Sequence, residues 1–346
     1  MRPQTAEITN QESGSVSDGQ LYPLRFKPIY QYRLWGGRRL ADVMNAPLPG
    51  EAPIGEAWVL SDRDDQQSLV ADGPCKGWSI RRLMAEFPEQ MIGRSADRLR
   101  RFPLLLKFID AREMLSVQVH PSDANKRFLP PGENGKTEAW VVVEAGAKSR
   151  IYNGLKPGTT KGILEQAIAN GSVVQDLAWF APRAGDAVFT PAGTVHALGG
   201  DLVVFEIQQN SDVTFRLYDW GHIDKETGNS RDLQVEKALA CIDFGNRHGA
   251  GLVRPVLEVT KPVERESLFD CAAFQVWRLR GHSSFTVGVA ERPRVLVCIE
   301  GAGQIDFNGT SFAVGQGDVF LLPATVGACI FHPGGSVILL EIALPE

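Results

Sequence analysis

Residues 185–196, GDAVFTPAGTVH, run from a short apolar strand pattern through a tight turn to a histidine. Pro191 and Gly193 mark the turn, because proline presets φ and glycine adopts conformations that other residues avoid. His196 is therefore held between rigid segments of backbone, which suits a metal ligand or a catalytic group. A histidine in a strand also has a purely structural interpretation, so the choice depends on matching features elsewhere in the chain.

The spacing G-x5-P-x-G-x2-H resembles the second signature of the cupin superfamily, whose histidine is a metal ligand inside a small jelly-roll barrel. Gly317 and Pro323 repeat the G-x5-P spacing, again with an aspartate after the glycine. An internal repeat of this kind indicates two related barrels. Ala328 stands where the repeat would place the histidine, so we expect the second barrel to bind no metal.

The remaining patterns predict a mainly β fold with minor α: two jelly-roll (cupin) barrels, the first with a few flanking helices. Short strands separated by Gly, Asn and Pro follow Pro255 to the end, as in an all-β barrel. Helical patterns cover residues 80–87 behind the N-cap Ser79, residues 163–168, and a short segment capped by Asp232. We expect a disordered tail at 1–20, a catalytic metal-binding domain at 21–250 and a C-terminal barrel at 251–346, whose last strand, 337–342, is central and buried.

Composition excludes several classes of protein. The chain has 346 residues, a net charge of −5 and five cysteines without C-x-x-C spacing. Reduced thiols in the cytoplasm are the simplest interpretation, and the spacing predicts neither a disulfide framework nor a cysteine zinc site. There is no run of eighteen apolar residues to span a membrane and no basic block to bind nucleic acid. The expected partner is a small molecule; the sequence assigns no oligomeric state.

A second group of polar residues lies upstream of His196. Residues 115–120 alternate strictly, so Gln118 and His120 share one strand face, about 7 Å apart at the usual rise per residue. Glu138 begins a later strand. Closed barrels aim residues from distant strands into one cavity, and two imidazoles with a carboxylate suit zinc, with iron or manganese as alternatives.

Several motifs together closely resemble the type I mannose-6-phosphate isomerases (phosphomannose isomerases) in their shorter bacterial form. The matching segments are LWGG at 34–37, GEAWVLS at 55–61, PLLLKFIDA at 103–111, LSVQVHPSD at 115–123, GKTEAW at 135–140, residues 185–196, EIQQNSD at 206–212 and RLYDW at 216–220. The resemblance implies one zinc ion per chain with four ligands: Gln118, His120, Glu138 and His196. It also implies an essential arginine at Arg216. Family members often carry an extra helical domain, for which this chain has no room.

These residue types suit an aldose–ketose isomerase that interconverts mannose 6-phosphate and fructose 6-phosphate through an enediol(ate). A divalent cation with one anionic ligand keeps positive charge to polarise substrate oxygens, and Arg216 adds fixed positive charge. Ser116, Lys107 and Lys136 are candidates for binding the substrate phosphate, although Lys136 is almost equally well explained as a solvated turn residue. Four residues are open candidates for the proton carrier: Asp110, Asp212, Asp219 and His222.

Two other functions are compatible with a cupin metal site. One is a non-catalytic, metal-dependent sugar-binding sensor, and the other is an iron oxygenase. Lys136 and Arg216 beside the metal favour phosphosugar chemistry over oxygen activation, and no DNA-binding or effector segment supports a sensor.

Overall fold

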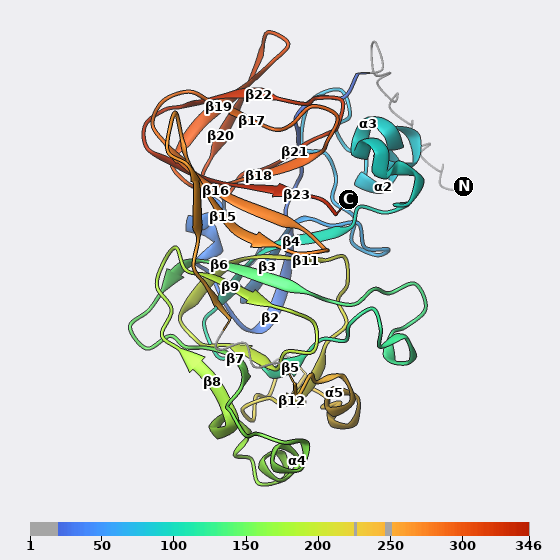
Figure 1. Ribbon diagram of the computed structural model, residues 1–346, viewed down its shortest axis with the longest axis vertical. Coiled ribbons are helices and arrows are strands. Elements are labelled where there is room, and N and C mark those ends of the chain that lie inside the picture. The colour runs from blue at the N-terminus through green and yellow to red at the C-terminus, as the bar shows by residue number, and fades with distance from the viewer. Residues whose placement is uncertain (1–19, 225–226, 246–250, 346) are drawn as a thin grey trace, which may run out of the picture.

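The computed structural model describes residues 20–224, 227–245 and 251–345, so the expected tail lies almost entirely outside the described residues. Four antiparallel sheets are stacked along the long axis of the molecule (Figure 1). The five-stranded sheet and the first seven-stranded sheet form one barrel, and the second seven-stranded sheet and the four-stranded sheet form the other. The predicted mainly β fold with minor helix is confirmed.

The strands are as follows, in the order in which they lie in each sheet. The five-stranded sheet contains β12 (Phe215–Tyr218), β5 (Val117–Val119), β10 (His196–Leu198), β7 (Ile151–Leu155) and β8 (Leu177–Phe180). The first seven-stranded sheet contains β13 (Leu252–Val253), β9 (Ala187–Thr190), β6 (Glu138–Ala145), β11 (Leu202–Gln209), β4 (Leu104–Ala111), β2 (Ile29–Gly37) and β3 (Ile54–Leu60). The second seven-stranded sheet contains β1 (Leu24–Arg25), β21 (Val319–Leu322), β18 (Arg294–Glu300), β23 (Val337–Ala343), β16 (Gln275–Gly281), β15 (Glu264–Asp270) and β14 (Val256–Val259). The four-stranded sheet contains β17 (Phe285–Val287), β22 (Cys329–Pro333), β19 (Ala302–Phe307) and β20 (Thr310–Gly315).

Short helices cover the ends and sides of this stack. They are α1 (Leu40–Val43), α2 (Ile80–Glu86), α3 (Pro88–Ile92), α4 (Lys161–Ala169), α5 (Val235–Cys241) and the 3-10 helices η1 (Gly93–Asp97), η2 (Lys126–Phe128) and η3 (Val173–Asp176). Helices α4 and α5 pack on the outer face of the five-stranded sheet, and α2 and α3 pack beside the two seven-stranded sheets. None of the described helices reaches the length and apolar character that crossing a bilayer requires.

The helix termini test the capping predictions individually. Ser79 caps α2 by accepting a hydrogen bond from the Arg82 N–H, as expected. Asn170 caps the C-terminus of α4, and Gly171 follows at φ 70°. The predicted cap of α5 is wrong: Gln234, not Asp232, is its N-cap residue, and it makes no side-chain cap hydrogen bond. The Gln234 side chain instead accepts a hydrogen bond from the Arg216 N–H, and this contact joins α5 to β12.

The central strands of the first seven-stranded sheet are buried on both faces. In β4, Leu104, Leu106 and Phe108 join the core between the two seven-stranded sheets, while Lys107 and Ile109 alternate to the other face. The same alternation runs through β6 and β11, so one face of this sheet is apolar and the other looks toward the five-stranded sheet. The near-continuous apolar sequence of β4 reflects this double burial.

The second barrel has an apolar interior. Phe285, Ile305, Phe331 and Leu339 are at most 3% exposed and belong to the cluster between its two sheets. Strand β23 is the fourth of seven strands, flanked by β18 and β16, which confirms that the last strand is central and buried.

The first and the last of the described strands, β1 and β23, both lie in this second barrel. Strand β1 pairs antiparallel with β21, with Leu24 opposite Leu321, although the next strand, β2, belongs to the first barrel. The chain crosses between the barrels near residue 255: β13 still pairs with β9 of the first barrel, and β14 pairs with β15 of the second. The division into 21–250 and 251–346 stays a prediction. Two short strands lie on the other side of that boundary: β1 is part of the second barrel and β13 is part of the first.

Candidate active site

Two facing sheets bring the predicted metal ligands together. Cross-strand neighbours in the five-stranded sheet place Gln118 between Arg216 and His196, so these three residues form a row on one face. His120 follows two residues after Gln118. Glu138 begins β6 in the opposite sheet, where it is paired with Thr190, next to Pro191 of the turn that precedes His196.

His120, Glu138 and His196 form a compact and buried group. Glu138 Oε2 lies 3.3 Å from His120 Nε2, and Glu138 Oε1 lies 3.1 Å from His196 Nε2. The three ligand atoms lie within 4.8 Å of one another, and each of the three residues is 1% exposed. This spacing and this set of donors fit a tetrahedrally coordinated divalent cation.

Second contacts orient both imidazoles. His120 Nδ1 lies 2.8 Å from the Val213 carbonyl, and His196 Nδ1 lies 2.9 Å from the Thr194 carbonyl. An Nδ1–H that donates to a carbonyl leaves the Nε2 lone pair to face Glu138, as metal-binding histidines require. Burial, assisted by Lys136, lowers the pKa of His120 to about 3, and burial also lowers the pKa of His196. Both rings are therefore neutral at physiological pH and able to bind a cation.

Gln118 lies beside the triad, and its side-chain amide is hydrogen-bonded to Ser116. Its Nε2 is 3.1 Å from His196 Nε2, and its Oε1 accepts a hydrogen bond from Ser116 Oγ at 3.0 Å. An amide binds a metal through its oxygen, so a liganding role requires a flip that turns Oε1 toward the triad. Ser116 Oγ would then accept from the amide nitrogen. This makes Ser116, a predicted phosphate-binding residue, equally well placed to orient Gln118.

Lys136 is part of the site rather than a solvated turn residue. It is 3% exposed, and its Nζ lies 2.7 Å from Glu138 Oε2 and 3.1 Å from His120 Nε2. Burial alone would raise the pKa of Glu138, but Lys136 and the two histidines outweigh it and hold this pKa well below its usual range. Glu138 is thus an anion suited to a cation.

Lys107 is paired with two carboxylates that were not selected from the sequence. Its Nζ lies 3.0 Å from Glu206 Oε1 and 3.9 Å from Glu56 Oε1, and Glu56 also binds Arg33 at 2.9 Å. The side chain is 4% exposed. A lysine within an apolar strand signals that a carboxylate must lie nearby, but not which one.

The ion pairs join into a charge chain that runs from the surface to the ligand set. Its members alternate in sign and are Arg33, Glu56, Lys107, Glu206, Lys136 and Glu138. Trp58 Nε1 donates to Glu56 at 2.8 Å and Trp140 Nε1 donates to Glu206 at 3.0 Å, so indoles supply further partners for two buried carboxylates.

Replacing Glu56 with glutamine is expected to destabilise the protein in a pH-dependent way. Burial would raise the pKa of Glu56, but Lys107 and Arg33 outweigh it and lower this pKa to about 2 from 4.5. A carboxyl whose pKa is lower in the folded state stabilises the folded protein at any pH above its unfolded-state pKa. That stabilisation is lost as the pH falls toward 2. The shift corresponds to on the order of 3 kcal/mol. Denaturant unfolding of wild type and Glu56→Gln should therefore differ by about that much at pH 7, by roughly half as much at pH 3, and converge only at about pH 2 or below.

A matched control for this substitution is Glu51→Gln, at an exposed position. It should leave the free energy of unfolding unchanged at every pH. A difference between wild type and Glu56→Gln that is equally large at pH 7 and pH 3 would contradict the assignment.

Arg216 lies next to Gln118 and has one guanidinium nitrogen without a hydrogen-bond partner among the described residues. Its Nε is buried without a hydrogen-bond partner among the described residues. Burial lowers the pKa of this guanidinium, and the nearby Arg231 adds to the effect. Phe215 and Leu217 on the other face of β12 pack with α5, as the alternation predicts. The site therefore places a half-buried guanidinium where an anion can reach it.

The four candidate proton carriers are placed very differently. Asp110 is fully buried and bound by the Arg39 side chain and backbone N–H, so it is committed to structure. Asp219 forms a bidentate pair with Arg231, and His222 lies 3.6 Å from both Asp219 and Glu113. Asp212 is exposed. We infer that none of these four is the strongest candidate.

The second barrel should bind no metal. Among the described residues, the only group of three His, Cys, Asp or Glu side chains spaced to hold an ion is the triad of the first barrel. Ala328, opposite in the repeat to His196, is exposed. Metal analysis should give about one ion per chain. An anomalous diffraction peak inside the second barrel would contradict this prediction.

Comparison with known proteins identifies the family of this chain. A sequence model of the family described as "Phosphomannose isomerase type I, catalytic domain" matches residues 24–160. Mannose-6-phosphate isomerase ManA of Bacillus subtilis is 35% identical over 309 residues, covering 88% of this chain and 94% of that protein. Mannose-6-phosphate isomerase of Streptococcus mutans is 32% identical over 304 residues, covering 88% and 93%.

Solved structures of isomerases with these names resemble this chain in fold. The mannose 6-phosphate isomerase from Bacillus subtilis superposes with a TM-score of 0.85 at 29% identity, covering 93% of this chain and 99% of that one. A variant of the phosphomannose isomerase from Salmonella typhimurium has the same fold, with a TM-score of 0.74 at 15% identity, covering 94% and 100%. The relatives at more than 30% identity extend through both barrels, well beyond the segment matched by the sequence model. This chain belongs to the type I phosphomannose isomerase family.

Proposed function

We propose that the protein is a zinc-dependent aldose–ketose isomerase that interconverts mannose 6-phosphate and fructose 6-phosphate through an enediol(ate). The observation that carries the proposal is the buried His120–Glu138–His196 triad, which contacts Lys136 and lies beside Gln118, the cross-strand neighbour of Arg216. The activity matches the names of the relatives in Bacillus subtilis and Streptococcus mutans.

Zinc is the metal that the donor set supports best. Two neutral imidazoles and one carboxylate, with Gln118 as a neutral fourth ligand, are typical of zinc sites that keep net positive charge. When bound, such an ion supplies Lewis-acid polarisation of substrate oxygens. We propose one ion per chain, in the first barrel.

Of the three cations near the site, Arg216 is the one best placed to bind an anionic group of the substrate. Lys107 and Lys136 are neutralised by buried glutamates, whereas Arg216 keeps a buried Nε without a partner. An anionic group of the substrate, either the phosphate or the oxygen of the enediolate, would satisfy Arg216. Ser116 can add a hydroxyl to the same face as Gln118.

Glu206 is our candidate for holding the proton that moves between C2 and C1. Burial raises the pKa of Glu206 above its ordinary value, although Lys107 and Lys136 oppose this, and a buried carboxyl with a raised pKa can act as a general base and acid. Trp140 fixes Oε2, which leaves Oε1 toward the two lysines.

A coupled assay tests the function directly. The metal-loaded protein should convert mannose 6-phosphate to fructose 6-phosphate, lose turnover on exhaustive chelation and regain it on adding zinc. Binding of the sugar phosphate without turnover would favour the sensor. Full activity after complete demetallation would refute the metal-dependent mechanism.

We also infer a reducing compartment, the cytoplasm. All five cysteines are free thiols, and four of them are buried. Burial raises the pKa of Cys241 and Cys329 to about 11, which keeps these thiols protonated and unreactive.

A further inference from the structure

We propose that Asn153 and Thr190 are positioning residues for the metal centre, and that the hydrogen bond between them sets the spacing of its ligands. Asn153 Nδ2 donates to Thr190 Oγ1 at 2.7 Å. Asn153 lies in β7 of the five-stranded sheet, and Thr190 lies in β9 of the first seven-stranded sheet, so we call this contact the inter-sheet bond. This role rests on the proposed function, because it requires that the triad bind a metal ion.

Each partner in the inter-sheet bond is the direct cross-strand neighbour of a triad ligand. Asn153 pairs with His196 between β7 and β10, and Thr190 pairs with Glu138 between β9 and β6. Side chains directly opposite each other on antiparallel strands share a face, with Cβ atoms about 5 Å apart. Glu138 Oε1 lies 3.1 Å from His196 Nε2, so the four residues form a closed ring of contacts. In this ring the inter-sheet bond lies opposite the pair of ligands.

The inter-sheet bond joins the two sheets that supply the ligands. His196 belongs to the five-stranded sheet and Glu138 to the first seven-stranded sheet, so the distance between them depends on how the two sheets are spaced. The turn at 191–195 already links Thr190 to His196 through the chain. The inter-sheet bond adds a second link beside that turn. A functional constellation has to be held within about 0.5 Å of its productive geometry, and two links constrain the ligands better than one.

The chemistry of the two side chains also indicates a specific role. Asparagine is disfavoured in strands, yet Asn153 lies within β7 and is 2% exposed. A buried amide is costly unless it is hydrogen-bonded, and the Phe189 carbonyl, 3.4 Å from Nδ2, is a poor acceptor. Thr190 Oγ1 is therefore the main partner of this amide. Thr190 is 1% exposed and precedes Pro191, which favours its extended backbone.

A positioning role and a purely structural role differ in what the loss of the inter-sheet bond changes. If the bond only stabilised the fold, its loss would lower the free energy of unfolding and leave the zinc affinity of the folded protein unchanged. If it positions the ligands, its loss weakens zinc binding by a protein that is still folded. Contacts behind metal ligands typically change metal affinity ten- to a hundredfold. The inter-sheet bond acts through neighbours of the ligands, so we expect the lower end, about tenfold.

Equilibrium competition between the zinc-loaded protein and a chromophoric chelator tests the proposal, with circular dichroism to show that each variant is folded. Thr190→Val replaces the hydroxyl by a methyl group of similar size and should raise the zinc Kd about tenfold. Thr190→Ser keeps the hydroxyl and should bind zinc nearly as tightly as wild type. Asn153→Ala removes the donor and should weaken zinc binding by a similar factor, which gives the same comparison should Thr190→Val fail to fold.

The double variant tests whether the hydrogen bond itself carries the effect. Each single substitution breaks the same bond, so Asn153→Ala/Thr190→Val should bind zinc about as weakly as the weaker single variant. Losses that multiply in the double variant would show that the two residues act independently, and would overturn the role of the inter-sheet bond.

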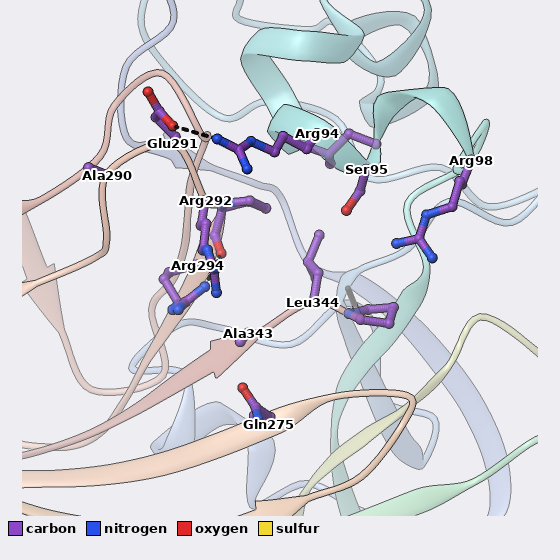
Figure 2. A pocket seen from close by; sticks show the side chains of 13 residues that line it. Arg94, Ser95, Arg98, Gln275, Ala290, Glu291, Arg292, Arg294, Ala343 and Leu344 are labelled. Carbon is purple, nitrogen blue, oxygen red and sulfur yellow. Dashed lines mark hydrogen bonds and ion pairs between the residues drawn. The ribbon is translucent and has the colours of Figure 1, made fainter.

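Two serines provide matched controls. Ser149 is also 2% exposed, and its hydroxyl donates to the Asp201 carbonyl at 2.6 Å, so Ser149→Ala loses a buried hydrogen bond that is outside the ring. Ser95 lines the cavity between η1 and the second barrel, and Ser95→Ala removes a hydroxyl outside the first barrel (Figure 2). Both variants should bind zinc as wild type does, although Ser149→Ala should unfold at a lower denaturant concentration.

The outcomes separate this proposal from that of the metal centre. An unchanged zinc Kd in Thr190→Val, with wild type binding zinc, would overturn the positioning role alone. An equal rise in Kd in Ser149→Ala would also overturn it, since the loss of any buried hydrogen bond in this barrel would then weaken zinc binding. A wild-type protein that binds no zinc would overturn the metal centre and the positioning role together.

Discussion

Replacing His196 with alanine is expected to remove the bound metal and to reduce kcat at least a thousandfold. The imidazole supplies one of the three buried ligand atoms of the triad, and its loss leaves Glu138 and His120 with too few strong donors. Lewis-acid polarisation contributes several kcal/mol, and about 4 kcal/mol corresponds to a thousandfold in rate. Elemental analysis of the purified variant, together with the coupled assay in zinc-supplemented buffer, measures both effects.

The control for this experiment is His282→Ala, at an exposed histidine of the second barrel. It should keep full metal content and turnover. Circular dichroism should show that His196→Ala retains its β structure, because the two large cores do not depend on the triad. A His196→Ala protein with normal metal content and normal turnover would rule out the proposed centre.

Replacing Arg216 with alanine is expected to reduce kcat about a hundredfold while leaving metal content unchanged. Removing one preorganised charged partner of a transition state costs on the order of 3 kcal/mol. Because the Nε of Arg216 has no hydrogen-bond partner among the described residues, its removal breaks no internal pair at that atom and should change stability little. Arg216→Lys should recover only part of the activity, since a point charge cannot reproduce the planar fork.

Steady-state kinetics also shows which anion Arg216 meets. A fall in kcat indicates the enediolate oxygen, whereas a rise in KM with kcat intact indicates the substrate phosphate. Arg183→Ala, at an exposed position, is the control and should change neither. Unchanged kcat and KM in Arg216→Ala would assign Arg216 to structure alone.

Around His196, strand alternation predicts which side chains share one face of their own strand. The row of Arg216, Gln118 and His196 follows from alternation within β12, β5 and β10 combined with the register between them. The sequence predicts the alternation within each strand. It does not predict the register between strands, which depends on how distant segments align. The family resemblance, rather than the alternation, supplied the grouping.

Glu56 and Glu206 show where the prediction stopped. The burial of Lys107 implied an anionic partner, but two glutamates that are far apart along the chain share this role because β3 and β11 flank β4. Asp232 was a wrong cap for a related reason, since Gln234 is engaged by β12. In each case a tertiary contact decided between residues that are locally equivalent.

The pairing of β1 with β21 has a consequence for synthesis on the ribosome. Leu24 emerges early, but its partner Leu321 follows roughly 300 residues later, which at 5–20 residues per second is about 15–60 s. During that interval Leu21 and Leu24, both fully buried in the finished protein, have no β21 to cover them. The N-terminal strand is therefore made long before the barrel in which it pairs, and until then its backbone can hydrogen-bond to the neighbouring residues 69–71.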